Sequence, residues 1–214
     1  METGKDVLWI QTNYGLDRLD LKKTTSQSFV EFKDNRFMTK SKDNELFTLK
    51  DDGYFYYYQQ EKGTFRKLEV PQPAFEYILS TTIDANNILW VFTSNNDNRS
   101  YQINKTKEGL SLTPNHLFKH PEKLRWSFPE GQLVYFIDET YSLYEYDFNN
   151  QQQYFIADLK TEIEERGEVS SIIKQQNDYY IGFKNSGLIV LKYMSDQKIK
   201  YQIQSTEIHS GIFC

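Results

Sequence analysis

Histidines and acidic residues are the side chains of this sequence that could do metal or acid–base chemistry. His116 and His120 are four residues apart in the stretch HLFKH, a spacing that can hold a metal ion on a helix, and the third histidine is His209. Prolines lie just before and directly after this stretch, so we expect a solvated loop there and no ligand-bearing helix. The sequence also contains no glycine-rich phosphate loop and no Gly-x-Ser-x-Gly elbow. We therefore predict no metal site, no cofactor and no catalytic residue.

Four carboxylates provide the enzyme alternative. Hydrolysis of a glycosidic bond needs two carboxyl groups, one as the acid and one as the nucleophile or base. The candidates follow short apolar runs and fall in expected turns: Asp51, Asp52, Asp138 and Glu139. Aspartate is also frequent in turns because it accepts hydrogen bonds from nearby backbone N–H groups. We interpret most of them as turn residues and retain a glycoside hydrolase as an alternative.

A second group of side chains could bind a polar ligand without cleaving it. Asparagine amides and tyrosine hydroxyls form hydrogen bonds with polyols, and they recur in equivalent turns. The predicted ligand-binding residues in these turns are Asn13, Tyr14, Asn95, Asn96, Tyr141 and Asn185. Trp126 is added because the corresponding residues of other copies, Thr81 and Ser171, are small. Its ring suits either a sugar face or a gap in the core, and the sequence leaves both open.

These turns recur because the chain repeats one unit. The stretch LWIQTNYGLDRLDL from Leu8 is echoed four times. The equivalent residues are Leu8, Leu46, Leu89, Val134 and Tyr179, separated by 38, 43, 45 and 45 residues. A period of about 43 residues is typical of four-stranded propeller blades.

Each copy predicts two apolar strands joined by a polar turn, then a third strand, with a leading strand before the later copies. The blade cores are expected over 7–32, 45–70, 88–112, 132–159 and 178–204. We predict an all-β chain forming a single β-propeller segment over residues 1–214, with about five four-stranded blades. A β-sandwich also has short strands but does not predict this period. The stretch TEIEERGE, residues 161–168, is expected to be a charged loop.

The two ends of the sequence differ from the inner copies. Only six residues precede Val7, so we expect the first copy to lack its leading strand. Residues 206–214, TEIHSGIFC, are similar to the leading strand GEVSSIIKQ and are interpreted as the leading strand of a further blade. This strand could close a five-bladed ring, or the chain could be part of a longer array. We favour the array, and we expect its open blade to form a homodimer.

Composition excludes several partners. The net charge of −5 argues against a nucleic-acid surface, which needs clustered Lys and Arg. No apolar run approaches the about 18–20 residues that span a bilayer, so we expect no membrane contact by this segment. The start of the sequence has no apolar segment of the signal-peptide type. Cys214 is the single cysteine, so no internal disulfide is possible.

The first copy resembles the two-component-regulator propeller repeat, whose pattern is Leu-Trp-Ile-Gly-Thr, two variable residues and Gly-Leu. The matching residues are Leu8, Trp9, Ile10, Thr12, Gly15 and Leu16. Gln11 stands in place of the family glycine, and the later copies match less well. The resemblance covers most of the chain in five degenerate copies.

This resemblance implies a function for the chain. In the family, such repeats form the periplasmic sensor region of hybrid two-component systems of Bacteroidetes, and many members respond to oligosaccharides. The resemblance thus implies a non-enzymatic, ligand-sensing propeller segment that binds a glycan-derived oligosaccharide. It would contact neighbouring sensor domains and signal to a histidine kinase outside this chain. A protein-binding scaffold remains a further alternative.

Overall fold

The chain forms two compact units, Met1–Lys119 and His120–Cys214. The structure is a computed structural model, and it describes residues 6–33, 35, 37–71, 75–118, 120–194 and 201–206. The described residues are almost entirely β-strands in antiparallel sheets, in which every strand pairs with the strands next to it in the sequence. Among these residues, no helix is long and apolar enough to cross a membrane.

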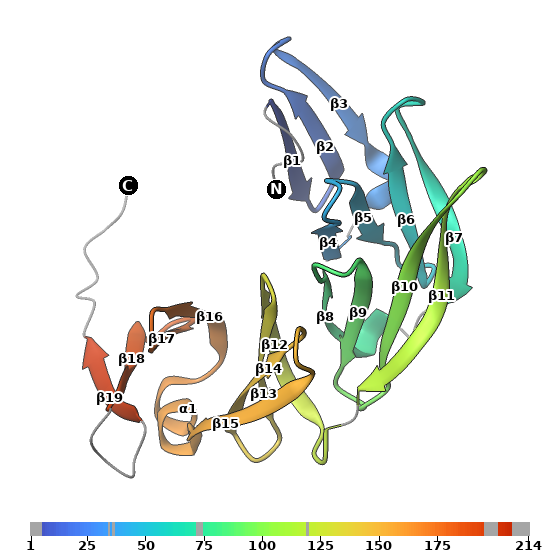
Figure 1. The fold of residues 1–214 in the computed structure, drawn as a ribbon. Helices are drawn as coiled ribbons and strands as arrows, with labels where there is room; N and C mark the ends of the chain where they lie inside the picture. Colours follow the sequence, from blue (N-terminus) through green and yellow to red (C-terminus); the bar gives the residue numbers. More distant parts are fainter. Residues whose placement is uncertain are drawn as a thin grey trace. The chain divides into compact units, whose positions relative to one another are not determined.

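The first unit contains three sheets that follow one another along the chain, from blue to green in Figure 1. The first sheet has three strands: β1 (Val7–Thr12), β2 (Gly15–Asp20) and β3 (Thr25–Phe29). The second has four: β4 (Phe37–Lys40), β5 (Leu46–Leu49), β6 (Tyr54–Gln59) and β7 (Thr64–Pro71). The third has four: β8 (Ile78–Ile83), β9 (Ile88–Thr93), β10 (Asn98–Thr106) and β11 (Gly109–Phe118). Two short 3-10 helices lie between the sheets: η1 (Val30–Phe32) and η2 (Phe75–Tyr77).

The second unit contains two four-stranded sheets and one helix, from yellow to red in Figure 1. Its first sheet consists of β12 (Leu124–Glu130), β13 (Leu133–Asp138), β14 (Ser142–Asp147) and β15 (Gln152–Asp158). Its second sheet consists of β16 (Val169–Gln175), β17 (Asp178–Phe183), β18 (Leu188–Tyr193) and β19 (Tyr201–Thr206). The helix α1 (Lys160–Arg166) connects them.

The sheets confirm most of the strands that the repeat predicts. In the last three sheets, each predicted leading strand is present as β8, β12 or β16, and the first sheet is three-stranded as expected. The leading strand expected before the second copy is β4. Two local expectations are wrong, since the blade core expected over 7–32 ends in the helix η1 instead of a strand, and the expected charged loop at 161–168 is largely the helix α1. The predicted further leading strand at 206–214 lies outside the described residues beyond Thr206.

The helix α1 forms because it has an apolar contact that the loop interpretation did not include. Ile163 is buried in the core between the two sheets of the second unit, next to Leu159. Glu162 in the first turn and Arg166 in the last turn favour the helix dipole. Gly167 then ends the helix with a positive φ of 87°.

Aromatic and aliphatic side chains fill the spaces between consecutive sheets. In β6, Phe55 and Tyr57 are buried while their neighbours are partly exposed, as the two-residue period of a strand requires. One cluster joins the first and second sheets, one the second and third, and one the two sheets of the second unit. Each sheet is therefore stabilised mainly by burying a face against the next sheet in its unit.

Candidate functional site

A pocket of about 480 Å³ lies in the first unit, where all three of its sheets contribute side chains. The lining comes from β1, β2, the β4–β5 loop, the ends of β5 and β6, the β6–β7 turn and the β10–β11 turn. Its polar and aromatic lining includes Trp9, Arg18, Asp43, Glu45, Tyr57, Tyr58, Gln59, Gln60, Glu61, Lys62 and Lys105. Such a combination of ring faces and convergent polar groups is typical of a small-molecule site.

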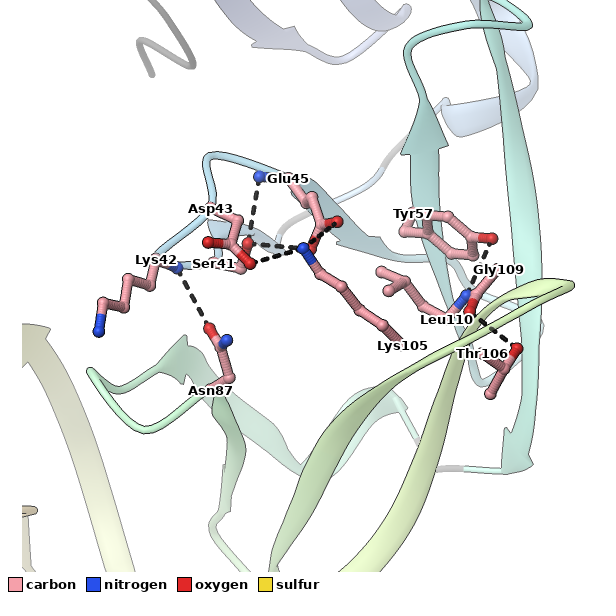
Figure 2. Close-up of polar contacts among 10 residues, drawn as sticks. All are labelled: Ser41, Lys42, Asp43, Glu45, Tyr57, Asn87, Lys105, Thr106, Gly109 and Leu110. Atoms are coloured by element: carbon pink, nitrogen blue, oxygen red, sulfur yellow. Dashed lines mark hydrogen bonds and ion pairs between the residues drawn. The ribbon is translucent and has the colours of Figure 1, made fainter.

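A lysine bridge contributes to the lining of this pocket, and Figure 2 shows its contacts. The Lys105 Nζ atom of β10 lies 2.7 Å from Asp43 Oδ2 and 3.6 Å from Glu45 Oε1 in the β4–β5 loop. The Ser41 hydroxyl also donates to Glu45 Oε2 at 3.2 Å. A second contact joins the same two sheets, since the Lys42 N–H donates to Asn87 Oδ1 at 3.3 Å. The β4–β5 loop is thus held against the third sheet at two points.

The lysine bridge changes the titration of its two ends. The hydrogen bond from Lys105, and then its positive charge, lower the pKa of Asp43 below the ordinary value of 3.8. The hydrogen bond to Asp43, and then the charge of Glu45, raise the pKa of Lys105 above 10.5. Both groups are therefore ionised throughout the neutral range, and the single ammonium group lies beside two carboxylates.

Aromatic side chains also line the pocket. Trp9 is 2% exposed and packs edge-on against Tyr58, with ring centroids 4.8 Å apart. The Arg18 guanidinium lies 5.9 Å from the Tyr58 ring centroid. Arg18 is directly opposite Trp9 in the β1–β2 register, so both side chains are on the same face of the sheet. Trp9, the tryptophan of the repeat motif, thus fills the core and also borders the pocket.

Tyr57 is held at the pocket by the third sheet. Its hydroxyl accepts a hydrogen bond of 3.2 Å from the Leu110 N–H, and this approach depends on the glycine before Leu110 (Figure 2). Gly109 has a φ of +132°, and a Cβ atom there would collide with the Tyr57 hydroxyl. Only glycine satisfies both requirements at this position.

We expect Gly109→Ala to lower the free energy of unfolding by about 1–3 kcal/mol, because it adds both backbone strain and a collision with Tyr57. Urea denaturation followed by circular dichroism measures this change. Gly131→Ala is the matched control, since Gly131 also has a positive φ but has nothing within 4 Å of an added Cβ. It should cost about 1 kcal/mol or less. Equal losses in the two variants would show that Tyr57 does not depend on this close approach.

None of the residues predicted from the turns lines this pocket. In the first unit, Asn13 and Tyr14 lie in the β1–β2 turn, and Asn95 and Asn96 lie in the β9–β10 turn. The β9–β10 turn is at the other end of β10 from the β10–β11 turn. Local contacts support these turns. The Tyr14 N–H donates to Thr12 Oγ1, Asn95 Oδ1 accepts from the Asp97 N–H, and Asn96 has a positive φ of 65°. Their role in binding stays a prediction.

The second unit brings two of the predicted residues together. The Arg125 guanidinium lies 4.6 Å from the ring centroid of Tyr141 and 5.6 Å from that of Trp126. Both rings are partly buried and pack against the core between the two sheets. Asn185 is exposed in the β17–β18 turn, apart from the core. Packing therefore accounts for much of the surface of Trp126. Filling a gap in the core was one of the two interpretations of this ring.

The expectation of a solvated loop at HLFKH is wrong. His116 belongs to β11, and His120 is buried, with its Nε2 atom 3.1 Å from Asp138 Oδ2 and its Nδ1 atom 3.2 Å from Gln153 Oε1. His209 lies outside the described residues. Within the described ranges, no group of three or more His, Cys, Asp or Glu side chains is placed to hold a metal ion.

The four carboxylates considered for hydrolysis are divided between the two units. Asp51 and Asp52 belong to the first unit, while Asp138 and Glu139 belong to the second. Asp138 is buried and accepts hydrogen bonds from Thr140 and Ser142 as well as contacting His120. Asp52 accepts from the Tyr54 N–H and the Tyr56 hydroxyl. Asp52 and Asp138 are thus engaged in turn structure, as their residue type predicts.

Most pocket residues gave no signal in the sequence because no motif marks them. Asp43 and Glu45 lie in the β4–β5 loop, and Lys105 lies at the end of β10. The one available signal was Trp9, which the repeat motif identifies and which borders the pocket. A search for charged residues opposite the motif tryptophan in the predicted hairpin would have found Arg18.

No family model and no curated protein matches this chain. Solved structures do match it. A chain described as the extracellular domain of a one-component system of B. thetaiotaomicron aligns with a TM-score of 0.65 at 11% identity, over 94% of this chain and 30% of that one. PorZ, a surface component of the type-IX secretion system of Porphyromonas gingivalis, aligns with a TM-score of 0.58 at 14% identity, over 95% of this chain and 25% of that one.

An enzyme also has a similar fold. Virginiamycin B lyase from Staphylococcus aureus, in an inactive form with quinupristin, aligns with a TM-score of 0.58 at 13% identity, over 91% of this chain and 64% of that one. The chain spans less than a third of the length of the first two structures that it matches. At these identities the likeness concerns the fold alone. Together with the antiparallel four-stranded sheets, it confirms the prediction of an all-β β-propeller fold.

Proposed function

We propose that this chain is the ligand-sensing propeller segment of a periplasmic sensor, and that it binds an oligosaccharide in the pocket of the first unit. The observation that carries the proposal is the lining of that pocket, which combines the Tyr58 ring with carboxylate, ammonium and amide groups. Aromatic faces cover the apolar faces of sugar rings, while the polar groups supply donors and acceptors for hydroxyl groups. The similarity in fold to an extracellular domain of a one-component system is consistent with sensing.

The signalling partners follow from the resemblance to the two-component-regulator repeat. We propose that ligand binding changes the contacts of this segment with neighbouring sensor domains, and that a histidine kinase outside this chain responds. We also propose a homodimer, which light scattering of the intact sensor region would test. A monomer at all concentrations and with every ligand would contradict the dimer.

The pocket favours binding over hydrolysis. A glycosidase needs a general acid whose pKa is raised, so that the carboxyl group keeps its proton near neutral pH. The Lys105 ammonium has the opposite effect on Asp43, since it lowers the pKa of that carboxyl group. The same ammonium group also contacts Glu45. Asp43 is therefore suited to orienting a ligand and not to donating a proton.

Calorimetric titration of the intact sensor region with a panel of oligosaccharides tests the proposal. We expect saturable binding of at least one saccharide, and we expect Tyr58→Leu to weaken that binding about tenfold because it removes a ring face while keeping apolar volume. Tyr154→Leu is the matched control, since Tyr154 is an exposed tyrosine of β15 outside the pocket.

Two results would contradict the proposal. One is a silent panel combined with saturable binding of a peptide or protein, which would favour the scaffold alternative. The other is release of shortened sugars from the panel that is lost in Asp43→Asn, which would favour hydrolysis.

A further inference from the structure

We propose that the oligosaccharide bound in this pocket is acidic, and that its carboxylate pairs with Arg18. This inference rests on the proposed function, because it specifies the chemical class of the ligand at the same site. Its basis is the difference between Arg18 and the other charged groups of the pocket.

Arg18 lies in β2 and is half-buried beside the aromatic side chains of the pocket. Its guanidinium is placed over the Tyr58 ring, and it forms no hydrogen bond or ion pair with any residue that the structure describes. A guanidinium has five N–H donors in a planar fork and stays charged at all physiological pH values. The pocket therefore presents a fixed cation whose donors are available to a ligand.

Each of the other charged groups of the lining has a group of opposite charge beside it. Lys105 pairs with Asp43 and Glu45, and the exposed Glu61 and Lys62 are adjacent and opposite in charge. The lining contains three acidic and three basic side chains in all. A neutral sugar would leave the guanidinium partly desolvated without an anionic partner, which is unfavourable.

A carboxylate matches this arrangement better than other anions do. Its two oxygens accept two parallel N–H groups of a guanidinium, and such bidentate pairs are among the strongest hydrogen bonds in proteins. It also brings a single negative charge. A phosphate monoester would bring nearly two charges into a pocket that already holds three carboxylates. A saccharide containing a hexuronic acid therefore fits the ring faces, the polar groups and Arg18 together.

Two matched pairs of probes test the inference by calorimetry on the intact sensor region. The first pair is a galacturonate–rhamnose disaccharide and its methyl ester, and the second is a glucuronate–N-acetylglucosamine disaccharide and its methyl ester. Each acid carries one carboxylate, and its ester has the same sugar rings without the negative charge. We expect at least one acid to bind about tenfold or more tightly than its ester, and we expect added salt to weaken binding of the acid alone.

Arg18→Gln should reduce the affinity for the acid about tenfold while leaving the affinity for the ester unchanged. Arg18→Lys should restore only part of the loss, because a lysine keeps the charge and lacks the planar fork. Arg125→Gln is the control, since Arg125 also lies over a tyrosine ring but belongs to the second unit. Circular dichroism of each variant verifies the fold.

The outcomes separate this inference from the proposed function. If neutral oligosaccharides bind in a Tyr58-dependent manner and the acids show no advantage over their esters, the acidic ligand is wrong and the sensing function stands. An equal effect of Arg18→Gln on acid and ester also overturns the inference. If no saccharide of either kind binds, the proposed function fails and the inference fails with it.

Discussion

Trp9→Ala is expected to lower the free energy of unfolding of the first unit by about 3–5 kcal/mol. The Trp9 ring is 2% exposed and contacts three other rings, those of Phe29, Tyr58 and Phe65. Alanine would leave a large cavity between the first and second sheets, and backbone that is tied into two sheets can collapse only partly into it. Urea denaturation followed by far-UV circular dichroism measures the loss.

Tyr14→Ala is the control for this prediction. Tyr14 is an aromatic residue of the same hairpin but is 82% exposed, so its removal should change the stability by about 0.5 kcal/mol or less. Hydrogen–deuterium exchange of Trp9→Ala should show lost protection in β1, β2 and β6. A loss below about 1 kcal/mol in Trp9→Ala would mean that the ring does not hold the two sheets together.

Asp138→Ala is expected to destabilise the second unit by about 3–5 kcal/mol, because it removes the partner of several buried polar groups at once. Asp138 is 1% exposed, and its Oδ1 atom accepts from the N–H and hydroxyl of Thr140 and from the Ser142 N–H. Its Oδ2 atom contacts His120, which is 3% exposed and lies edge-on to the rings of Phe136 and Tyr144. Without Asp138, the His120 ring nitrogen and the turn N–H groups lose their acceptor.

Asp52→Ala provides the comparison. Asp52 also follows a buried strand and also accepts from a turn N–H, but it is exposed, so water replaces its hydrogen bonds. We expect a loss of about 1 kcal/mol or less. Thermal unfolding of both variants, with the fluorescence of Trp126 as a probe near Asp138, distinguishes the two turns. Similar losses in the two variants would show that burial of the His120–Asp138 contact contributes little.

The fold was predictable because its signal is repeated. Five apolar strands at intervals of 38–45 residues fix the number of sheets, and a polar turn after each strand gives the hairpin that follows. Elements with a weak signal in the sequence were harder to locate. The strand β4 has only four residues. The helix α1 depends on the burial of Ile163, a single apolar residue among charged neighbours.

The pocket was not predictable for a related physical reason. The sequence pattern shows which end of a strand carries a turn, but it does not show where the spacing between neighbouring sheets leaves a cavity. Residues such as Arg18, Tyr58 and Lys105 come together only because three sheets pack side by side in the first unit. His120 was misread because a proline on either side does not prevent a single ring from being buried against Phe136 and Tyr144.

Among the described residues, each sheet pairs only strands from one stretch of the chain, which is no longer than the repeat of about 43 residues. An array built in this way can gain or lose a whole repeat by duplication or deletion of a gene segment, because each strand pairs with strands close to it in the sequence. The pocket requires three consecutive sheets and draws its lining from residues 7–110. Ligand specificity can therefore diverge through substitutions in that interval while the strand register of the second unit stays unchanged, which separates the evolution of recognition from that of the scaffold.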